Sequence, residues 1–281
     1  MTDMFAPVLM PQSGEATTAL RGPQFGDGSR EVGLRQSGPK DAGREAGSKD
    51  VPDYLHRYYW WTYIHPNAVR FFERQWLVSA ILWGNYERLR DAALAELGAQ
   101  SGDQMGATLQ VACAYGDLTP RLAQQCAAAN GTLDVVDVLP IQLRNLRGKL
   151  PPGSPTRLLA MNAADLKLAD GSYDQVLVFF LLHEQPTVVR RQTLQEALRV
   201  LRPGGKLVIV EYAQPRWWHP ARYFWRIVLA ALEPFALDLW RDDIAAWMPA
   251  EGSRQTQVRR LFGGLYQMTT FTRDSAATVK D

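Results

Sequence analysis

The sequence predicts an α/β fold in which a mostly parallel sheet is covered by helices on both faces. Short apolar runs alternate with helical stretches from about residue 108 to residue 212, as in successive strand–helix–strand units. Two strand-like runs near the end flank Gly263-Gly264, which predicts an antiparallel hairpin. The chain has 281 residues, 46% of them hydrophobic, which is enough for one sizeable core.

The chain begins with a stretch that lacks apolar periodicity. Residues 1–50 are rich in Gly, Ser, Pro and mixed charges, and we predict a disordered tail. Residues 51–103 are predicted to form an aromatic-rich helical cap, with a helix over 68–83 that Asn67 caps. One face of that helix carries apolar residues at steps of three and four, namely Val69, Phe72, Trp76, Ala80 and Trp83.

Residues 104–213 are predicted to form the core of the sheet. Five strands are expected, at 109–113, 133–136, 156–161, 173–180 and 206–212. After the first strand, Thr119 is expected to cap a helix that has Pro120 at its first position. A second helix is expected over 190–201, stopped by Arg202-Pro203-Gly204-Gly205.

Residues 214–256 form a second aromatic region. Apolar side chains recur at helical spacing, with Trp217 and Trp218 before them. They are Phe224, Ile227, Val228, Ala231, Leu232 and Phe235, interleaved with Arg216, Arg222 and Arg226. This pattern fits both an interfacial membrane helix and a buried lid over a site. Both could hold if the lid opens toward the bilayer. Residues 257–281 are expected to supply the hairpin, from strands at 258–262 and 265–271, and a short tail.

The composition excludes several classes of function. A formal net charge of +2 lacks the strong basic bias of nucleic-acid-binding proteins. Two cysteines without a CxxC pair indicate neither a disulfide framework nor a zinc site, which fits a reducing cytoplasm. Without a signal segment or an apolar run of about 18 residues, we expect a cytoplasmic protein resting peripherally on the inner face of the cell membrane. The sequence does not predict its oligomeric state.

Polar side chains cluster where the predicted strands end. Ligands of open α/β sheets bind beyond the carboxyl ends of the strands. Asp137, at the end of the second strand, is positioned to bind ribose hydroxyls, and Asn162, after the third, to bind an adenine edge. An ordinary turn Asp and a turn Asn are the structural alternatives.

Three segments of this core resemble class I methyltransferases. They are Ala163-Ala164-Asp165-Leu166, Asp170-Gly171-Ser172-Tyr173-Asp174 and Leu201-Arg202-Pro203-Gly204-Gly205-Lys206-Leu207. Glu211-Tyr212-Ala213 is similar to the branch that methylates quinone rings. The resemblance implies a Rossmann-like fold with seven strands and a site for S-adenosylmethionine, formed by Ala112, Ala114, Gly116, Asp137, Asn162 and Ala163.

The first loop departs from the methyltransferase pattern. That family has an acidic residue and three glycines where this chain has Gln110, Ala112, Ala114 and Gly116. Glycine at these positions permits close approach of backbone to cofactor. The change is consistent with a degenerate, inactive site or with a repurposed chemistry.

The altered loop at residues 111–117, with residues 59–66 and 262–269, resembles the rhodoquinone biosynthesis (RquA) family. Members are associated with conversion of ubiquinone to rhodoquinone, in which an amino group replaces a ring methoxy group. The resemblance implies that S-adenosylmethionine donates the nitrogen and that Mn²⁺ assists.

Attack of an amine on a quinone requires a polarised carbonyl, which a Lewis-acidic ion could supply. His183, Glu184 and Glu211 offer imidazole and carboxylate ligands for Mn²⁺, and His183, Tyr115 and Asp117 are the candidate catalytic residues. Each could instead be structural: His183 bonding a backbone carbonyl, Glu184 facing solvent, Glu211 orienting a neighbour, Asp117 capping a helix and Tyr115 packing. Two other functions stay open, methyl transfer to a quinol or phenol and a catalytically silent quinone-binding protein.

Overall fold

The computed structural model describes residues 51–59, 69, 71–98, 105–233 and 235–275. All of them belong to a compact unit spanning residues 44–281. The predicted tail at 1–50, the predicted cap Asn67 and most of the motif at 59–66 lie outside the described residues.

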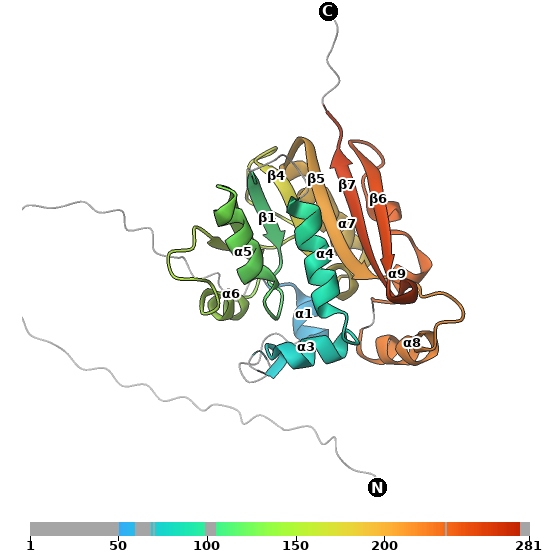
Figure 1. The fold of residues 1–281 in the computed structure, drawn as a ribbon. Helices are drawn as coiled ribbons and strands as arrows, with labels where there is room; N and C mark the ends of the chain where they lie inside the picture. Colours follow the sequence, from blue (N-terminus) through green and yellow to red (C-terminus); the bar gives the residue numbers. More distant parts are fainter. Residues whose placement is uncertain (1–50, 60–68, 70, 99–104, 234, 276–281) are drawn as a thin grey trace, which may run out of the picture. The chain divides into compact units, whose positions relative to one another are not determined.

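Seven strands form one sheet in the order β3-β2-β1-β4-β5-β7-β6 (Figure 1). The strands β1 to β5 pair in parallel, and β7 runs antiparallel to both β5 and β6. The mostly parallel seven-stranded sheet with a C-terminal antiparallel hairpin is therefore confirmed. The strand bounds are β1 (Ala107–Val111), β2 (Thr132–Asp137), β3 (Arg157–Ala160), β4 (Tyr173–Phe179), β5 (Leu201–Tyr212), β6 (Ser253–Leu261) and β7 (Tyr266–Arg273).

Helices cover both faces of this sheet. Figure 1 shows α4 (Tyr86–Gly98) and α5 (Leu118–Ala128) on the near face and α7 (Thr187–Val200) on the far face. The helix α6 (Pro140–Arg147) connects β2 to β3. Because both faces are covered, the central strands are continuous apolar runs rather than alternating ones, as the fully buried Val176, Leu177 and Val178 illustrate.

The remaining elements lie before and after this core. They are α1 (Asp53–Tyr58), α3 (Gln75–Ile81), α8 (Ala221–Leu232), α9 (Asp238–Arg241) and the 3₁₀ turns η2 (Leu182–Glu184), η3 (Ile244–Trp247) and η4 (Phe262–Gly264). Within the described ranges, no helix has the length and apolar character needed to cross a bilayer.

The prediction of one continuous helix over 68–83 is wrong. The chain leaves the helix at Glu73, Arg74 adopts extended backbone, and α3 begins at Gln75. The apolar periodicity does not mark a buried face either, since Trp76 is 61% exposed and Trp83 45% exposed. The interruption frees Glu73 to reach the first loop of the core, as described below.

The helix after β1 begins two residues earlier than predicted. Leu118 starts α5, and Asp117 takes the N-cap position without making a capping bond, so Thr119 is not the cap. Thr119 is instead completely buried inside the first turn, next to Pro120.

The hairpin is confirmed, but its first strand is longer than expected. The strand β6 begins at Ser253, five residues before the predicted start at Val258. At the turn, Gly263 has a φ of 61° and Gly264 a φ of 94°, a left-handed region in which glycine carries no steric penalty.

Candidate functional site

A cavity of about 490 Å³ lies beyond the carboxyl ends of the parallel strands. One end is formed by the loops after β1, β2 and β3, with Ala112, Ala114, Tyr115, Asp137, Asn162 and Ala163 in its wall. The other end is mostly apolar and holds His183, Glu184 and Glu233 beside Phe180, Tyr212 and Trp225. Eight of the eleven predicted site residues therefore line one cavity, whereas Gly116, Asp117 and Glu211 do not.

The loop after β1 keeps the backbone shape of a glycine-rich loop despite its alanines. Ala112 has a φ of 70°, in the left-handed region that glycine adopts freely and that costs other residues about 1–2 kcal/mol. The side-chain amide of Gln110 donates to the Ala112 carbonyl at 2.9 Å and supports this turn. Gly116 must be glycine, because a Cβ would lie 2.5 Å from the Tyr86 hydroxyl.

Residues from before the core hold this loop in place. The Glu73 carboxylate accepts hydrogen bonds from the Gly116 amide at 3.0 Å, from Asn145 at 2.6 Å and from Lys149 at 2.6 Å. The Lys149 ammonium also donates to the Gly116 carbonyl at 2.9 Å. This cluster joins the segment before α3 to the first loop and α6.

Tyr115 fills part of the cavity wall and is held on two sides. Its hydroxyl accepts a hydrogen bond from Gln142 at 2.9 Å, and its ring stacks on Phe72 with centroids 6.2 Å apart. A bulky aromatic group therefore stands in the first loop, at the end of the cavity where a nucleoside would lie.

Asp137 connects the first two loops. Its carboxylate accepts from the Cys113 amide and the Leu139 amide, each at 2.8 Å. Burial raises the pKa of this carboxyl, and the two backbone bonds lower it in part. The Cys113 thiol also bonds this carboxylate. Because a carboxylate offers about four acceptor positions, the group can still accept a hydrogen bond from a ribose hydroxyl in the cavity.

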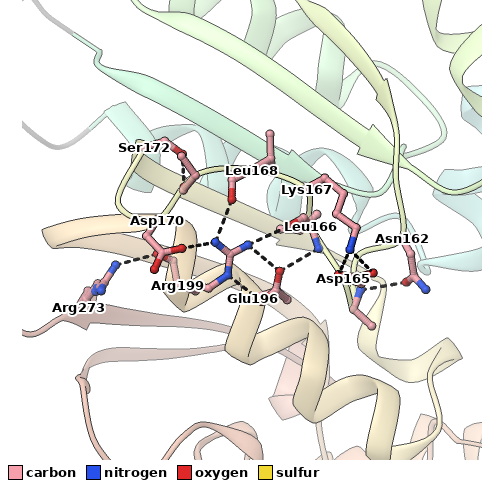
Figure 2. Close-up of polar contacts among 12 residues, drawn as sticks. Asn162, Asp165, Leu166, Lys167, Leu168, Asp170, Ser172, Glu196, Arg199 and Arg273 are labelled. Carbon is pink, nitrogen blue, oxygen red and sulfur yellow. Dashed lines mark hydrogen bonds and ion pairs between the residues drawn. The ribbon is translucent and has the colours of Figure 1, made fainter. Parts of the chain in front are cut away.

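Asn162 has a local partner as well as a place in the cavity wall. Its side-chain oxygen accepts from the Ala164 amide at 3.0 Å, in a turn closed by a bridge to Asp165. Figure 2 shows how Arg199 holds the following segment: it binds Glu196, whose carboxylate also accepts from the Leu166 amide at 2.8 Å. The loop after β3 is thus fixed by α7 rather than by a ligand.

Asp117 is structural in this arrangement. Its carboxylate binds Arg90 at 2.8 Å and Arg121 at 2.6 Å, and Tyr86 donates to it at 3.2 Å. Burial would raise the pKa of Asp117, but the two guanidinium groups outweigh burial and lower it. The ion pairs of Asp117 are with residues on α4 and α5, and the carboxylate does not line the cavity. This geometry does not support the predicted catalytic role.

His183 and Glu211 form a buried pair beside the cavity. His183 Nδ1 lies 3.0 Å and 3.2 Å from the two oxygens of Glu211, which is fully buried. The same carboxylate accepts from the Leu182 and Tyr212 amides, each at 3.0 Å. Burial opposes a charged imidazole, but Glu211, together with Glu233 and Glu184, outweighs burial and raises the pKa of His183 to about 9. These carboxylates favour the imidazolium, and Nε2, 3.8 Å from Glu184, is the ring nitrogen that is not bonded to Glu211.

The predicted set of Mn²⁺ ligands does not fit a resident ion. The oxygens of Glu211 are occupied by two amides and His183 Nδ1, and Glu184 lies 3.8 Å from His183 Nε2. Across the described part of the chain, no three His, Cys, Asp or Glu side chains are arranged to hold a metal ion. Glu211 acts as the partner that orients His183.

Two functional candidates were missed by sequence reasoning. Glu233 follows α8, lines the cavity and accepts from the Tyr59 hydroxyl at 2.7 Å. Burial raises the pKa of Glu233, and His183 and Tyr59 offset part of that rise. A lone Glu between two apolar segments gives no local signal, because its place depends on a partner 174 residues away.

Arg190 was also missed. Its side chain is fully buried and donates to the carbonyls of Leu182 at 2.9 Å and of Gln185 and Phe235, both at 3.0 Å. Its guanidinium lies 4.2 Å from the ring centroid of Trp247. Arg190 therefore brackets η2, the turn that carries His183 and Glu184.

The chain is similar in sequence to proteins named as methyltransferases. Residues 108–205 match the family described as "Methyltransferase domain". The demethylmenaquinone methyltransferase of Tropheryma whipplei (strain Twist) is 30% identical over 161 residues, covering 56% of this chain and 61% of that protein. The ubiquinone/menaquinone biosynthesis C-methyltransferase UbiE of Hahella chejuensis is 32% identical over 120 residues, covering 41% and 47%. The chain thus spans about half of the length of these relatives.

A solved structure shares the fold. The N-methyltransferase NodS of Bradyrhizobium japonicum superposes with a TM-score of 0.51 at 18% identity, over 67% of this chain and 97% of that one. The Rossmann-like fold of class I S-adenosylmethionine-dependent methyltransferases is therefore confirmed. Neither the relatives nor this structure tests the resemblance to the rhodoquinone family.

Proposed function

We propose that this chain is an S-adenosylmethionine-dependent transferase that modifies the ring of a lipid quinone. The observation that carries the proposal is the single cavity, which joins the loops around Asp137 to an apolar end containing the His183–Glu211 pair. The first end suits a nucleoside and the second a quinone ring. Two relatives are named as a demethylmenaquinone methyltransferase and a ubiquinone/menaquinone biosynthesis C-methyltransferase, and these names support the same substrate class.

The finer proposal is that the reaction makes rhodoquinone, by replacing a ring methoxy group of ubiquinone with an amino group from S-adenosylmethionine. The His183–Glu211 pair, in which the carboxylate favours the imidazolium, supports this over methyl transfer. An imidazolium is an acid, and it can donate a hydrogen bond to a quinone carbonyl and make the ring electrophilic. Methyl transfer to a quinol would instead call for a base.

Each residue of the site then has a defined task. Glu211 fixes the orientation and the charge of His183, and His183 Nε2 donates to the quinone carbonyl. Asp137 binds the ribose hydroxyls of the donor, and Tyr115 limits where the donor can lie. S-adenosylmethionine supplies the nitrogen. Its amine adds to the ring carbon, a proton leaves nitrogen and the methoxy group departs as methanol, which leaves the donor joined to the ring through nitrogen. Transfer of the donor's α-proton and two electrons to the quinone then gives an imine on a reduced ring, and water hydrolyses that imine to the amino-substituted quinol and a 2-oxo acid.

The alternative is methylation of a quinol or phenol, which the relatives' names favour. Product mass separates the two reactions, because exchange of methoxy for amino lowers the quinone mass and methylation raises it. The full chain is incubated with ubiquinone and nitrogen-15-labelled S-adenosylmethionine, and the quinone is analysed by mass spectrometry. Incorporation of the label is expected.

The assay is run with and without added Mn²⁺, because the resemblance implies that ion while the described side chains do not fit a resident one. An unlabelled, heavier product would overturn amination and leave methyl transfer. No product, together with no heat of binding for S-adenosylmethionine, would indicate the silent quinone-binding protein.

A further inference from the structure

Exposed apolar side chains concentrate in two stretches of the chain. Among the described residues, eleven large hydrophobic side chains are exposed, and nine of these lie within residues 71–83 or 217–227. The two exceptions are Val188 on α7 and Val258 on β6. The nine are Phe71, Trp76, Ile81, Trp83, Trp217, Trp218, Tyr223, Phe224 and Ile227, and we call them the α3–α8 surface.

The two stretches meet in space. The ring of Trp83, just after α3, lies 5.8 Å from that of Phe224 and 6.2 Å from that of Trp225, both on α8. Figure 1 shows α3 and α8 at the end of the sheet where the parallel strands terminate. The exposed apolar groups of the two stretches therefore meet at Trp83 and Phe224, next to Trp225, which lines the cavity. Contiguous apolar patches of this kind mark interaction sites on soluble domains.

The same two helices form part of the cavity wall. From α3, Leu77 and Val78 line the cavity while Trp76 is exposed; from α8, Trp225 and Leu229 line it while Ile227 is 72% exposed. Ile81 does both, since it lines the cavity and is 37% exposed. The apolar end of the cavity therefore reaches the α3–α8 surface between the two helices.

The charged residues in and next to these stretches are mostly basic. They include Arg74, Arg216, Arg222 and Arg226, whereas Glu73 is paired with Lys149 and Glu87, bonded to Gln75, follows α3. Basic residues beside tryptophans and aliphatic groups match a membrane surface with anionic headgroups. A symmetric contact with a second copy would instead bring like charges together.

We propose that the α3–α8 surface docks on an anionic lipid bilayer and that the cavity opens into that bilayer between α3 and α8. A lipid-tailed substrate can then move from membrane to cavity without crossing water. This inference rests on the proposed function for the identity of that substrate, but the docking itself can be tested without catalysis.

Docking is measured by co-sedimentation of the full chain with phosphatidylcholine vesicles that contain either no phosphatidylglycerol or about 30% of it. The phosphatidylglycerol gives the vesicles a negative surface potential. The double variant F224E/I227E places two charges on the surface and spares the cavity wall. We expect its binding to anionic vesicles to fall at least tenfold. Val188→Glu and Val258→Glu are matched controls at exposed valines elsewhere, and we expect wild-type binding from both.

Equal sedimentation of F224E/I227E and wild type would overturn the docking surface. The docking surface would also be overturned if the wild-type protein formed dimers in vesicle-free solution and the double variant did not. A second copy of the chain would then cover the surface. Turnover separates docking from function: F224E/I227E is expected to convert a tail-less quinone in solution as wild type does, and to lose turnover of a polyprenyl quinone held in vesicles. Normal vesicle binding with no turnover of either quinone would sink the proposed function and leave the docking surface standing.

Discussion

At the scale of single residues, the charge of His183 depends on Glu211. Without that carboxylate, only Glu233 and Glu184 would oppose the effect of burial, and the pKa of the imidazole would fall. If the imidazolium donates to the substrate, wild-type activity should fall as pH rises through about 9. In Glu211→Gln the alkaline limb of the pH–rate profile should move to lower pH, toward the free-imidazole value of about 6.5.

Glu184→Gln is the control, because Glu184 contributes less than Glu211 to the charge of His183. Its alkaline limb should stay near that of wild type. The sign for stability follows from the raised pKa: the pair stabilises the fold fully below pH about 6.5, and this contribution is lost as pH rises through about 9. An unshifted limb in Glu211→Gln would remove His183 as the titrating acid.

Ala112 offers a second test at this scale. Its positive φ carries strain that glycine relieves, whereas Ala114 has no positive φ and gains nothing from the same change. We expect Ala112→Gly to be about 1–2 kcal/mol more stable than Ala114→Gly. Urea unfolding of both variants measures the difference, and equal stabilities would show that the loop is not strained.

At the scale of elements, a hydrogen bond of Tyr59 helps to tie α1 across the cavity. Tyr59, directly after α1, donates to the buried Glu233 after α8. Tyr59→Phe should cost about 1–3 kcal/mol, because a buried carboxyl loses its partner. Amide exchange should speed up over residues 51–59, as measured by mass spectrometry. Glu233→Gln keeps an acceptor for Tyr59 and should exchange more slowly than Tyr59→Phe; the reverse order would contradict this role.

Element prediction succeeded where burial leaves a pattern in the chain. The central strands are buried on both faces and read as apolar runs, so β4 and most of β5 are recognisable. The start of β6 is not, because Arg254, Gln255 and Gln257 are exposed on an edge strand and resemble a loop. The break before α3 is also invisible, since the tertiary bonds of Glu73 override a helical periodicity.

At the scale of the whole molecule, ligand binding should be coupled to stability. S-adenosylmethionine at 100 times its Kd should stabilise the fold by about 2.7 kcal/mol, or roughly 5 °C or more in Tm. Asp137→Ala should lose this shift, since it removes the proposed ribose partner. Asp242→Ala, at an exposed position, should keep it. A full shift in Asp137→Ala, seen by differential scanning fluorimetry, would place the nucleoside elsewhere.

The candidate site was predictable in part. Strand ends identified Asp137, Asn162 and His183, because topology alone brings those positions to one edge. Contacts of other residues near the site were not predictable. Asp117 forms ion pairs with arginines on α4 and α5, and Glu233, which follows α8, bonds Tyr59. Such assignments depend on contacts between segments far apart in the chain, for which one sequence carries no periodic signal.

The three-donor cluster at Glu73 limits how this protein can be cut or recombined. A fragment that begins at residue 105 would retain every strand but leave the Gly116 amide, Asn145 and Lys149 without their shared acceptor. A chimera that grafts residues 108–205 onto a related scaffold would inherit the same deficit, unless the scaffold presents a carboxylate at that place. The first loop of the sheet thus depends on a residue from outside the core, and a swap that keeps these contacts has to carry the segment around Glu73 with it.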